Sequence, residues 1–336
     1  MPRLLLLLTG GTLLMTPTDP AKGKAGSISL DEERMIRDLV REVPSLGRLA
    51  DFDTRLLFQM DSANMQPKHW IELAREVHAG LATGNYDGVV IVHGTDTMAY
   101  SASALALLLG PLPKPVVLTG AQRPLIEART DARQNLVDAA LVATLPVPEV
   151  AIVMGSRVLR GVRSTKRDAW SLDAFDSPNC RPLVDLGIGV EVAGHVREEA
   201  TLAAFDPRLE SKVLAVRVFP GLDPDLVRGA IRVGVKALVL TAYGTGTLPN
   251  LDGSLIPALE EAREKGVPVL VVSQCHRGFV ELGQYEGGAA AARVGAISGG
   301  EMTVEAAVAK MMIGLGRYGA GDELRQYLVT NVVGER

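Results

Sequence analysis

The chain has 336 residues and a net charge of −4, with 47% hydrophobic, 22% charged and 4% aromatic residues. The acidic balance and the few aromatic rings argue against a nucleic-acid-binding protein, which needs a basic surface and usually stacking side chains. The length predicts about two domains.

The two cysteines, Cys180 and Cys275, lie far apart in the sequence and have no metal-ligand spacing. We therefore expect reduced thiols, a cytoplasmic location and no metal site. The apolar start at residues 3–8 imitates a signal peptide, but it is short and runs into "TGGT" without a small-residue cleavage site. No apolar run reaches membrane-spanning length, so we expect a buried first strand and no membrane partner.

Short apolar runs alternate with longer helical patterns along the chain. The predicted strands, in chain order, are residues 4–8, 54–58, 89–92, 116–118, 150–154, 213–218, 237–240 and 267–271. The predicted helices are residues 31–43, 67–82, 97–109, 132–143, 224–233, 255–264 and 304–315. Pro67 suits the first turn of its helix, where the missing N–H costs nothing. This alternation is typical of parallel sheets with helices on both faces.

The alternation stops in the polar segment 195–212. We interpret this segment as a linker between a larger α/β domain, residues 1–194, and a smaller parallel α/β domain, residues 213–336. For the larger domain we predict a mostly parallel, doubly wound, flavodoxin-like sheet.

Polar side chains follow four of the predicted strands. They are Thr12, the pair Asp61 and Ser62, the pair Thr95 and Asp96, and the pair Ala121 and Gln122. Because parallel strands bring their carboxyl ends to one edge, where open α/β sheets bind ligands, these residues predict a cleft lined by hydroxyls and carboxylates. No histidine is obviously placed there as a base.

Each of these pieces also has a simpler explanation. "TGGT" suits a tight turn, and it matches neither the dinucleotide fingerprint nor the P-loop. Thr95, Asp96 and Thr97 are residues that often cap a following helix. The functional interpretation therefore depends on several strand ends meeting at one place.

Six motifs occur in one order along the chain. They are "TGGT", "MDS" followed by "MxPxxW", "HGTDTMAYSASAL", "TGAQRPL", "RGVRSTKRDAWSLDAFDSPN" and "GGEMTVEA". Together they resemble the bacterial L-asparaginase family, most closely its cytoplasmic type I branch, from residue 4 to about residue 335. The resemblance implies hydrolysis of asparagine to aspartate and ammonia through a threonine nucleophile and an acyl-enzyme, without a cofactor. It also implies homodimers, often paired into tetramers, in which the C-terminal domain of one subunit closes the site of its neighbour.

The resemblance also assigns roles to individual residues. It makes Thr12 the primary nucleophile and groups Thr95, Asp96 and Lys166 in a second catalytic constellation. Ser62, backed by Asp61, is expected to bind the substrate α-carboxylate, and Asp96 its α-ammonium group. The other residues that it places in the substrate-binding site are Gly11, Gly94, Ala121 and Gln122.

An alcohol is a poor nucleophile until a base takes its proton. Lys166 is the natural candidate for that base, although an ordinary lysine amine is protonated at pH 7. We hypothesise that the substrate α-ammonium offsets the charge of Asp96 and thereby weakens its hold on the Lys166 proton.

The sequence departs from the family in the long loop at residues 16–29, which is expected to act as a lid. The family commonly has an assisting tyrosine in this loop, and here Ser27 takes its place. Tyr243 is an alternative assistant, or simply an aromatic residue at the end of a core strand.

Two other functions remain open at this point. One is the amidase subunit of a tRNA-dependent amidotransferase, which would act with a partner subunit and usually has an extra N-terminal domain. The other is a non-catalytic amino-acid sensor. Ammonia release from asparagine and glutamine separates all three.

Overall fold

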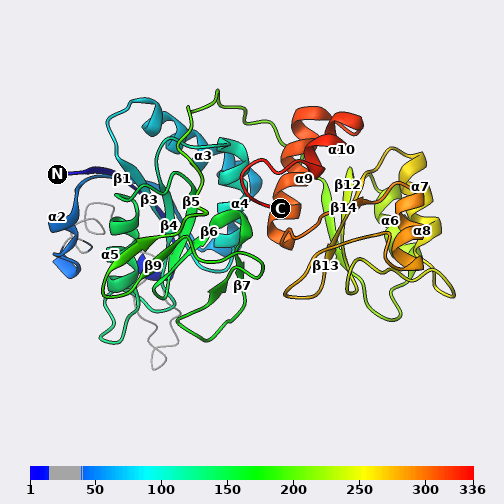
Figure 1. Ribbon diagram of the computed structural model, residues 1–336, viewed down its shortest axis with the longest axis horizontal. Coiled ribbons are helices and arrows are strands. Elements are labelled where there is room, and N and C mark those ends of the chain that lie inside the picture. Colours follow the sequence, from blue (N-terminus) through cyan, green and yellow to red (C-terminus); the bar gives the residue numbers. More distant parts are fainter. Residues whose placement is uncertain (15–38, 40) are drawn as a thin grey trace. The chain divides into compact units, whose positions relative to one another are not determined.

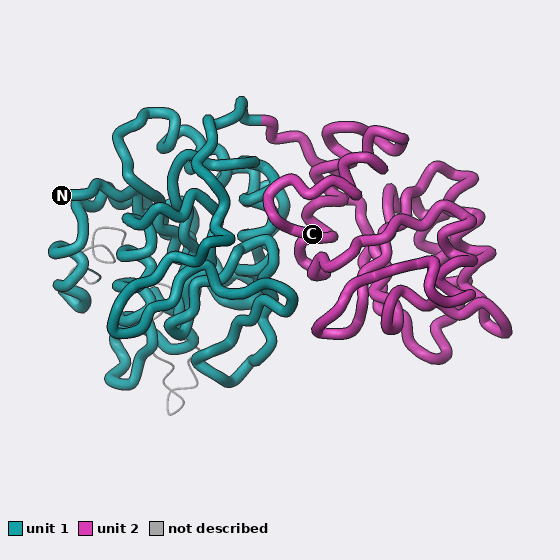
Figure 2. The backbone as a smooth tube through the Cα atoms, in the orientation of Figure 1, with its two compact units in different colours: residues 1–205 teal, residues 206–336 magenta. Residues whose placement is uncertain are grey.

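The computed structural model describes residues 1–14, 39 and 41–336. Its two compact units are Met1–Phe205 and Asp206–Arg336 (Figures 1 and 2), and the division falls within the polar segment 195–212. Each unit has a sheet and a core of its own.

Unit 1 is built on an eight-stranded sheet in the order β10-β9-β6-β5-β4-β3-β1-β2. The five parallel strands are β1 (Arg3–Gly10), β2 (Asp51–Met60), β3 (Gly88–Val92), β4 (Val116–Thr119) and β5 (Val150–Met154). Their order, 2-1-3-4-5, is that of flavodoxin-like folds, so the predicted fold class is confirmed. The antiparallel extension consists of β6 (Arg157–Arg160), β9 (Val184–Leu186) and β10 (Val190–Val192).

The leucine run of β1 is apolar on both sides because helices cover both faces of the sheet. Leu4, Leu6 and Leu8 belong to a core cluster that also contains residues of α2 (Leu46–Leu49) and α5 (Ala132–Val142). Leu5 points the other way and lies close to Gly80 of α3. Figure 1 shows α5 on one side of the sheet and α3 on the other.

The predicted helices at residues 67–82, 97–109, 132–143, 224–233, 255–264 and 304–315 are present, whereas the helices at residues 46–49, 286–293 and 322–329 were not predicted. In unit 1, α3 (Pro67–Ala82) begins at its proline, and α4 (Met98–Leu109) is buried over almost its whole length. The predicted helix at residues 31–43 lies mostly outside the described residues. A two-stranded sheet of β7 (Thr165–Lys166) and β8 (Phe175–Asp176), which the sequence did not predict, places Lys166 opposite Phe175.

Unit 2 has a four-stranded parallel sheet, which confirms the predicted smaller α/β domain. Its strands are β11 (Val213–Arg217), β12 (Ala237–Ala242), β13 (Val269–Ser273) and β14 (Ile297–Ser298). Its helices are α6 (Pro224–Arg232), α7 (Ile256–Glu264), α8 (Glu286–Arg293), α9 (Val304–Tyr318) and α10 (Asp322–Val329). No helix in the described part of the chain is long and apolar enough to cross a membrane.

Candidate active site

Two glycines at the end of β1 let three strand ends approach one another. Gly10 and Gly11 have φ values of +101° and +87°, a region that side chains other than glycine rarely adopt. A Cβ on Gly10 would lie 2.3 Å from the carbonyl oxygen of Met60, and one on Gly11 would lie 2.5 Å from the Cα of Gly94. The backbone just before Thr12 therefore packs directly on the backbone just before Thr95.

The end of β2 reaches the same place. A Cβ on Gly94 would lie 2.6 Å from the Oγ of Ser62, which is 3% exposed. Asp61 shapes this turn, since its carboxylate accepts a hydrogen bond of 2.9 Å from the N–H of Ala63. The Thr97 hydroxyl in turn donates to the Ser62 carbonyl over 2.8 Å. The carboxyl ends of β1, β2 and β3 thus meet, as the parallel sheet predicted.

Lys166 lies between a hydroxyl and a carboxylate. Its Nζ donates to Thr95 Oγ1 over 2.9 Å and to Asp96 Oδ1 over 2.6 Å. The Lys166 side chain is 17% exposed and that of Asp96 is 66% exposed, so the carboxylate is accessible to a ligand. Helix α4 uses Thr97 as its N-cap residue. The side chains of Thr95 and Asp96 contact Lys166 instead of capping α4.

Gln122 completes the surroundings of the Thr95 hydroxyl. Thr95 Oγ1 donates to Gln122 Oε1 over 3.0 Å, and Gln122 Nε2 donates to the carbonyl of Ser171 over 3.1 Å. The turn that carries Gln122 is held by Asp131, whose carboxylate accepts from the backbone N–H of Gln122 at 3.0 Å. Asn135 donates to the carbonyl of Gly120 at the start of this turn over 2.9 Å.

An ionic network holds the β7–β8 hairpin against β6. Arg157 contacts Asp173 at 3.1 Å and Asp176 at 3.3 Å, and Arg167 contacts Asp173 at 3.3 Å. Arg167 directly follows Lys166, and Asp176 lies on β8, the strand paired with β7. These ionic contacts fix the element from which Lys166 reaches Thr95.

The histidine of the "HGTDTM" motif lies beneath the site. Burial lowers the pKa of His93 to about 4, so the imidazole is neutral at pH 7. Its Nδ1 lies 2.7 Å from the carbonyl oxygen of Gly94, which can only accept, so Nδ1 carries the proton. The buried Nε2 has no partner among the residues described. His93 therefore supports the turn and has no contact that would make it a base for Thr95.

The structure places the predicted site residues in three groups. Hydrogen bonds and ionic contacts join Thr95, Asp96, Lys166 and Gln122, while close packing joins Gly11, Gly94 and Ser62. Thr12 opens a short 3₁₀ turn (Thr12–Leu14) directly after Gly11, Asp61 caps the Ser62 turn, and Ala121 is 1% exposed beside Gln122. Ser27 lies outside the described residues.

Sequence reasoning missed Asp131, Asn135 and the carbonyl of Ser171. The first two had a signal, because an acidic residue and an amide four positions apart at the start of a helix suit the support of a neighbouring turn. A backbone carbonyl such as that of Ser171 has no sequence signal.

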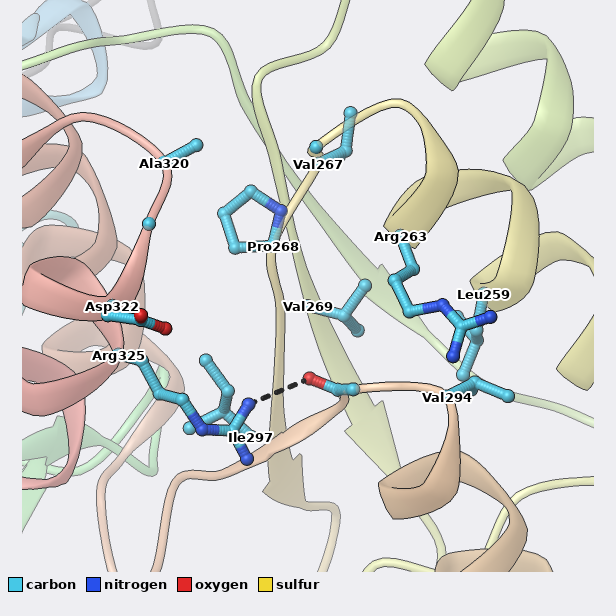
Figure 3. A pocket seen from close by; sticks show the side chains of 13 residues that line it. Leu259, Arg263, Val267, Pro268, Val269, Val294, Ile297, Ala320, Asp322 and Arg325 are labelled. Carbon is cyan, nitrogen blue, oxygen red and sulfur yellow. Dashed lines mark hydrogen bonds between the residues drawn. The ribbon is translucent and has the colours of Figure 1, made fainter.

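A pocket of about 180 Å³ lies elsewhere, in unit 2 (Figure 3). It is mostly apolar and lies at the amino ends of β13 and β14, with Arg325 donating to the carbonyl of Gly295 over 3.3 Å. Parallel sheets bind ligands at the opposite edge, so we assign this pocket no part in the reaction. Within residues 1–14, 39 and 41–336, no cluster of three or more His, Cys, Asp or Glu side chains is arranged to hold a metal.

Comparisons with known proteins agree with the motif order. The profile described as "Asparaginase, N-terminal" matches residues 3–198, and "Glutaminase/Asparaginase C-terminal domain" matches residues 212–328. The chain belongs to the asparaginase family. The predicted family resemblance is thereby confirmed over nearly the whole chain.

Individual relatives are similar to this chain over most of its length. L-asparaginase 1 of Escherichia coli K12 is 39% identical over 282 residues, covering 82% of each chain. The solved structure of the thermostable L-asparaginase from Thermococcus kodakarensis superimposes with a TM-score of 0.88 at 32% identity, covering 99% of this chain and 98% of its own. A glutamyl-tRNA(Gln) amidotransferase component from Pyrococcus abyssi is 34% identical over 346 residues, covering 100% of this chain and 77% of the relative.

Proposed function

We propose that this asparaginase-family chain hydrolyses L-asparagine to L-aspartate and ammonia, with Thr12 as the nucleophile that forms an acyl-enzyme. The observation that carries the proposal is the contact of one amine, Lys166, with the hydroxyl of Thr95 and the carboxylate of Asp96. A hydroxyl within hydrogen-bond distance of an amine can lose its proton to it once that amine is neutral.

We assign the roles as follows. Thr12 attacks the amide carbon, and its hydroxyl proton passes to the amide nitrogen, which leaves as ammonia. Water then attacks the acyl carbon and gives a proton to Thr95 while the Thr95 proton moves to Lys166; the bond to the Thr12 oxygen breaks, that oxygen takes the remaining proton of the attacking water, and aspartate leaves as the carboxylate. The close contact of Gly11 with Gly94 brings the backbone before Thr12 against the backbone before Thr95, and we place Ala121 and Gln122 beside the substrate amide.

The substrate's own charges fit the two remaining groups. Asp96, 66% exposed, is the carboxylate for the α-ammonium group, and Ser62, in the turn that Asp61 caps, binds the α-carboxylate. In this scheme the incoming ammonium takes over part of the Asp96 charge and frees Lys166 to act as the base. A substrate analogue without the α-amino group is expected to lose turnover as well as affinity, and unchanged kcat would exclude this step.

The assembly is proposed to be a homodimer or a pair of homodimers in the cytoplasm. Two large apolar side chains are exposed in the loop between β7 and β8: Trp170 (95%) and Leu172 (37%). Neighbouring exposed apolar side chains are typical of protein contacts. Trp170→Glu is expected to weaken self-association in sedimentation experiments, whereas Trp170→Phe is expected to preserve it.

The decisive experiment measures ammonia released from asparagine by the purified chain alone. Release that depends on both Thr12 and Lys166 supports the proposal. Turnover only of glutamine, or only with a partner protein, would favour the amidotransferase alternative, which the Pyrococcus abyssi relative makes worth testing. Binding of asparagine without ammonia release would favour the sensor. The control variants are Thr12→Ala and Lys166→Met.

A further inference from the structure

The hydrogen bonds that run from the β7–β8 hairpin to Lys166 have a single possible direction. The Ser171 carbonyl can only accept, so it must face Gln122 Nε2, at 3.1 Å. The other end of that carboxamide, Oε1, can only accept as well, so the Thr95 hydroxyl must donate to it, over 3.0 Å. One backbone carbonyl therefore sets the orientation of the Gln122 side chain and of the Thr95 hydroxyl.

This direction is opposite to the one that base catalysis requires. Thr95 has one hydroxyl proton, and in this arrangement it points to Gln122. The Thr95 oxygen meanwhile accepts from Lys166 Nζ, which is a donor here to Thr95 and to Asp96. For Lys166 to act as a base, its ammonium proton must go to solvent and the Thr95 O–H must rotate toward the neutral amine.

We propose that Gln122 is a positioning residue that holds the Thr95 proton away from Lys166. Its carboxamide oxygen competes with the neutral Lys166 amine for the same proton, and it favours the arrangement in which Lys166 is charged. This inference rests on the proposed function, because it concerns the proton that Lys166 is proposed to take.

Both ends of Gln122 are anchored, so it is a stable acceptor. Asp131 accepts from its backbone N–H at 3.0 Å. On the other side, Asp168 accepts from the backbone N–H of Trp170 at 2.7 Å and of Ser171 at 2.8 Å, and these bonds hold the pKa of Asp168 below its usual value. A turn stabilised in this way keeps the Ser171 carbonyl directed at Gln122.

Several other ionisable groups face this network. They are Asp96 on Lys166, Asp131 behind Gln122, Asp168 in the hairpin turn, the ionic network of Arg157, Arg167, Asp173 and Asp176, and the buried His93. Substitutions at Gln122 leave all of them in place. Their effect on the pH profile is the same in every variant, so it cancels when the profiles of two variants are compared.

The test is the pH profile of kcat/KM for two variants with opposite expected shifts. Gln122→Met removes the acceptor, so the acid limb is expected to move to lower pH by roughly 0.5 unit, the size expected for one neutral hydrogen bond. Gln122→Glu supplies a charged acceptor that favours the Lys166 ammonium, so the limb is expected to move to higher pH. The position of the limb is the readout, because the plateau also reflects contact with the substrate amide.

The matched control is Gln326→Glu on α10, which makes the same charge change at an exposed glutamine outside the Thr95 network. It is expected to leave the limb where it is. Shifts in the same direction for both Gln122 variants, or no shift in either, would overturn the inference. A wild-type protein that releases no ammonia would instead overturn the proposed function, so the two failures are distinguishable.

Discussion

Two lysine–carboxylate pairs of this chain lie in contrasting surroundings. In unit 2, Lys310 and Glu335 form an ion pair in which both side chains are completely buried. In unit 1, Lys166 and Asp96 form a pair whose lysine is largely covered and whose carboxylate is 66% exposed. The chemistry of the two pairs is the same, but their remaining partners differ.

The buried pair has several further hydrogen-bond partners. Glu335 accepts from the backbone N–H groups of Val332 at 2.9 Å and Val333 at 2.8 Å, and Lys310 also donates to the carbonyl of Thr330. These contacts fasten the C-terminal segment to α9. The charges are tolerated in the core because each is paired and hydrogen-bonded.

The pair in the candidate site is different because its partners can change. The second contact of Lys166 is a hydroxyl with a proton of its own, and Asp96 presents most of its surface to solvent. In the proposed mechanism, a substrate ammonium therefore competes with Lys166 for Asp96. An ion pair whose other hydrogen-bond partners are fixed stabilises the fold, whereas a pair whose partners can change suits the proposed catalysis.

The largest expected effect is on activity. Lys166→Met is expected to lower kcat by about 10²–10⁴-fold, the usual contribution of a general base, with little change in the unfolding midpoint because the site is partly solvated. Steady-state ammonia release and a thermal melt check both halves of this statement. Retained activity would remove Lys166 from its proposed role.

The corresponding change in the buried pair is expected to affect stability instead. Lys310→Met leaves the Glu335 charge buried without its partner and is expected to cost about 3–5 kcal/mol in the free energy of unfolding. Urea denaturation measures this loss. The double variant Lys310→Met/Glu335→Leu is expected to recover much of it, and a double variant as unstable as the single one would contradict this explanation.

A smaller effect concerns pH. Burial by itself would raise the pKa of Glu335, but Lys310 and the N–H groups of Val332 and Val333 outweigh it, and the net pKa is lowered. Stability from this group is therefore present above about pH 4.3, the ordinary glutamate value, and is lost as pH falls through the lowered value. Glu335→Gln is expected to flatten this acid dependence of the urea midpoint. If the urea midpoint of Glu335→Gln falls with acid as steeply as that of the wild type, this explanation is contradicted.

The smallest effect is expected for a third pair, on the surface of α7. Lys265 Nζ contacts Glu261 at 2.9 Å, and the lysine side chain is 46% exposed. Exposed pairs of this kind are screened by solvent and add little. Lys265→Gln is expected to leave both activity and the unfolding midpoint unchanged within error. A measurable loss of stability would show that solvent exposure alone does not determine how much each of the three pairs contributes to stability.

Much of the fold was predictable because its signals are local. The runs in β1 and β3 are apolar on both faces, as strands covered on both sides must be, and α3 begins at a proline that suits its first turn. The short strands β6 to β10 were not predicted. Strands of two to four residues have too little periodicity to be recognised without their partners.

The candidate site was predictable to a similar extent. Thr12, Ser62, Thr95 and Gln122 follow predicted strands, and parallel strands bring such residues to one edge. Lys166 was assigned only through the family resemblance, because its strand is two residues long and carries no signal of its own. Ser171 acts through a backbone carbonyl, which every residue has.

The sequence by itself determined where most of the longer strands and helices lie, the glycines that allow close approach at the end of β1, and the family to which the chain belongs. These depend on residues that are neighbours along the chain. Only the tertiary structure decided that Lys166 reaches Thr95, 71 positions away, and that the Ser171 carbonyl, 49 positions from Gln122, orients its side chain. Such contacts depend on how a whole sheet and hairpin pack, and no local pattern encodes that geometry.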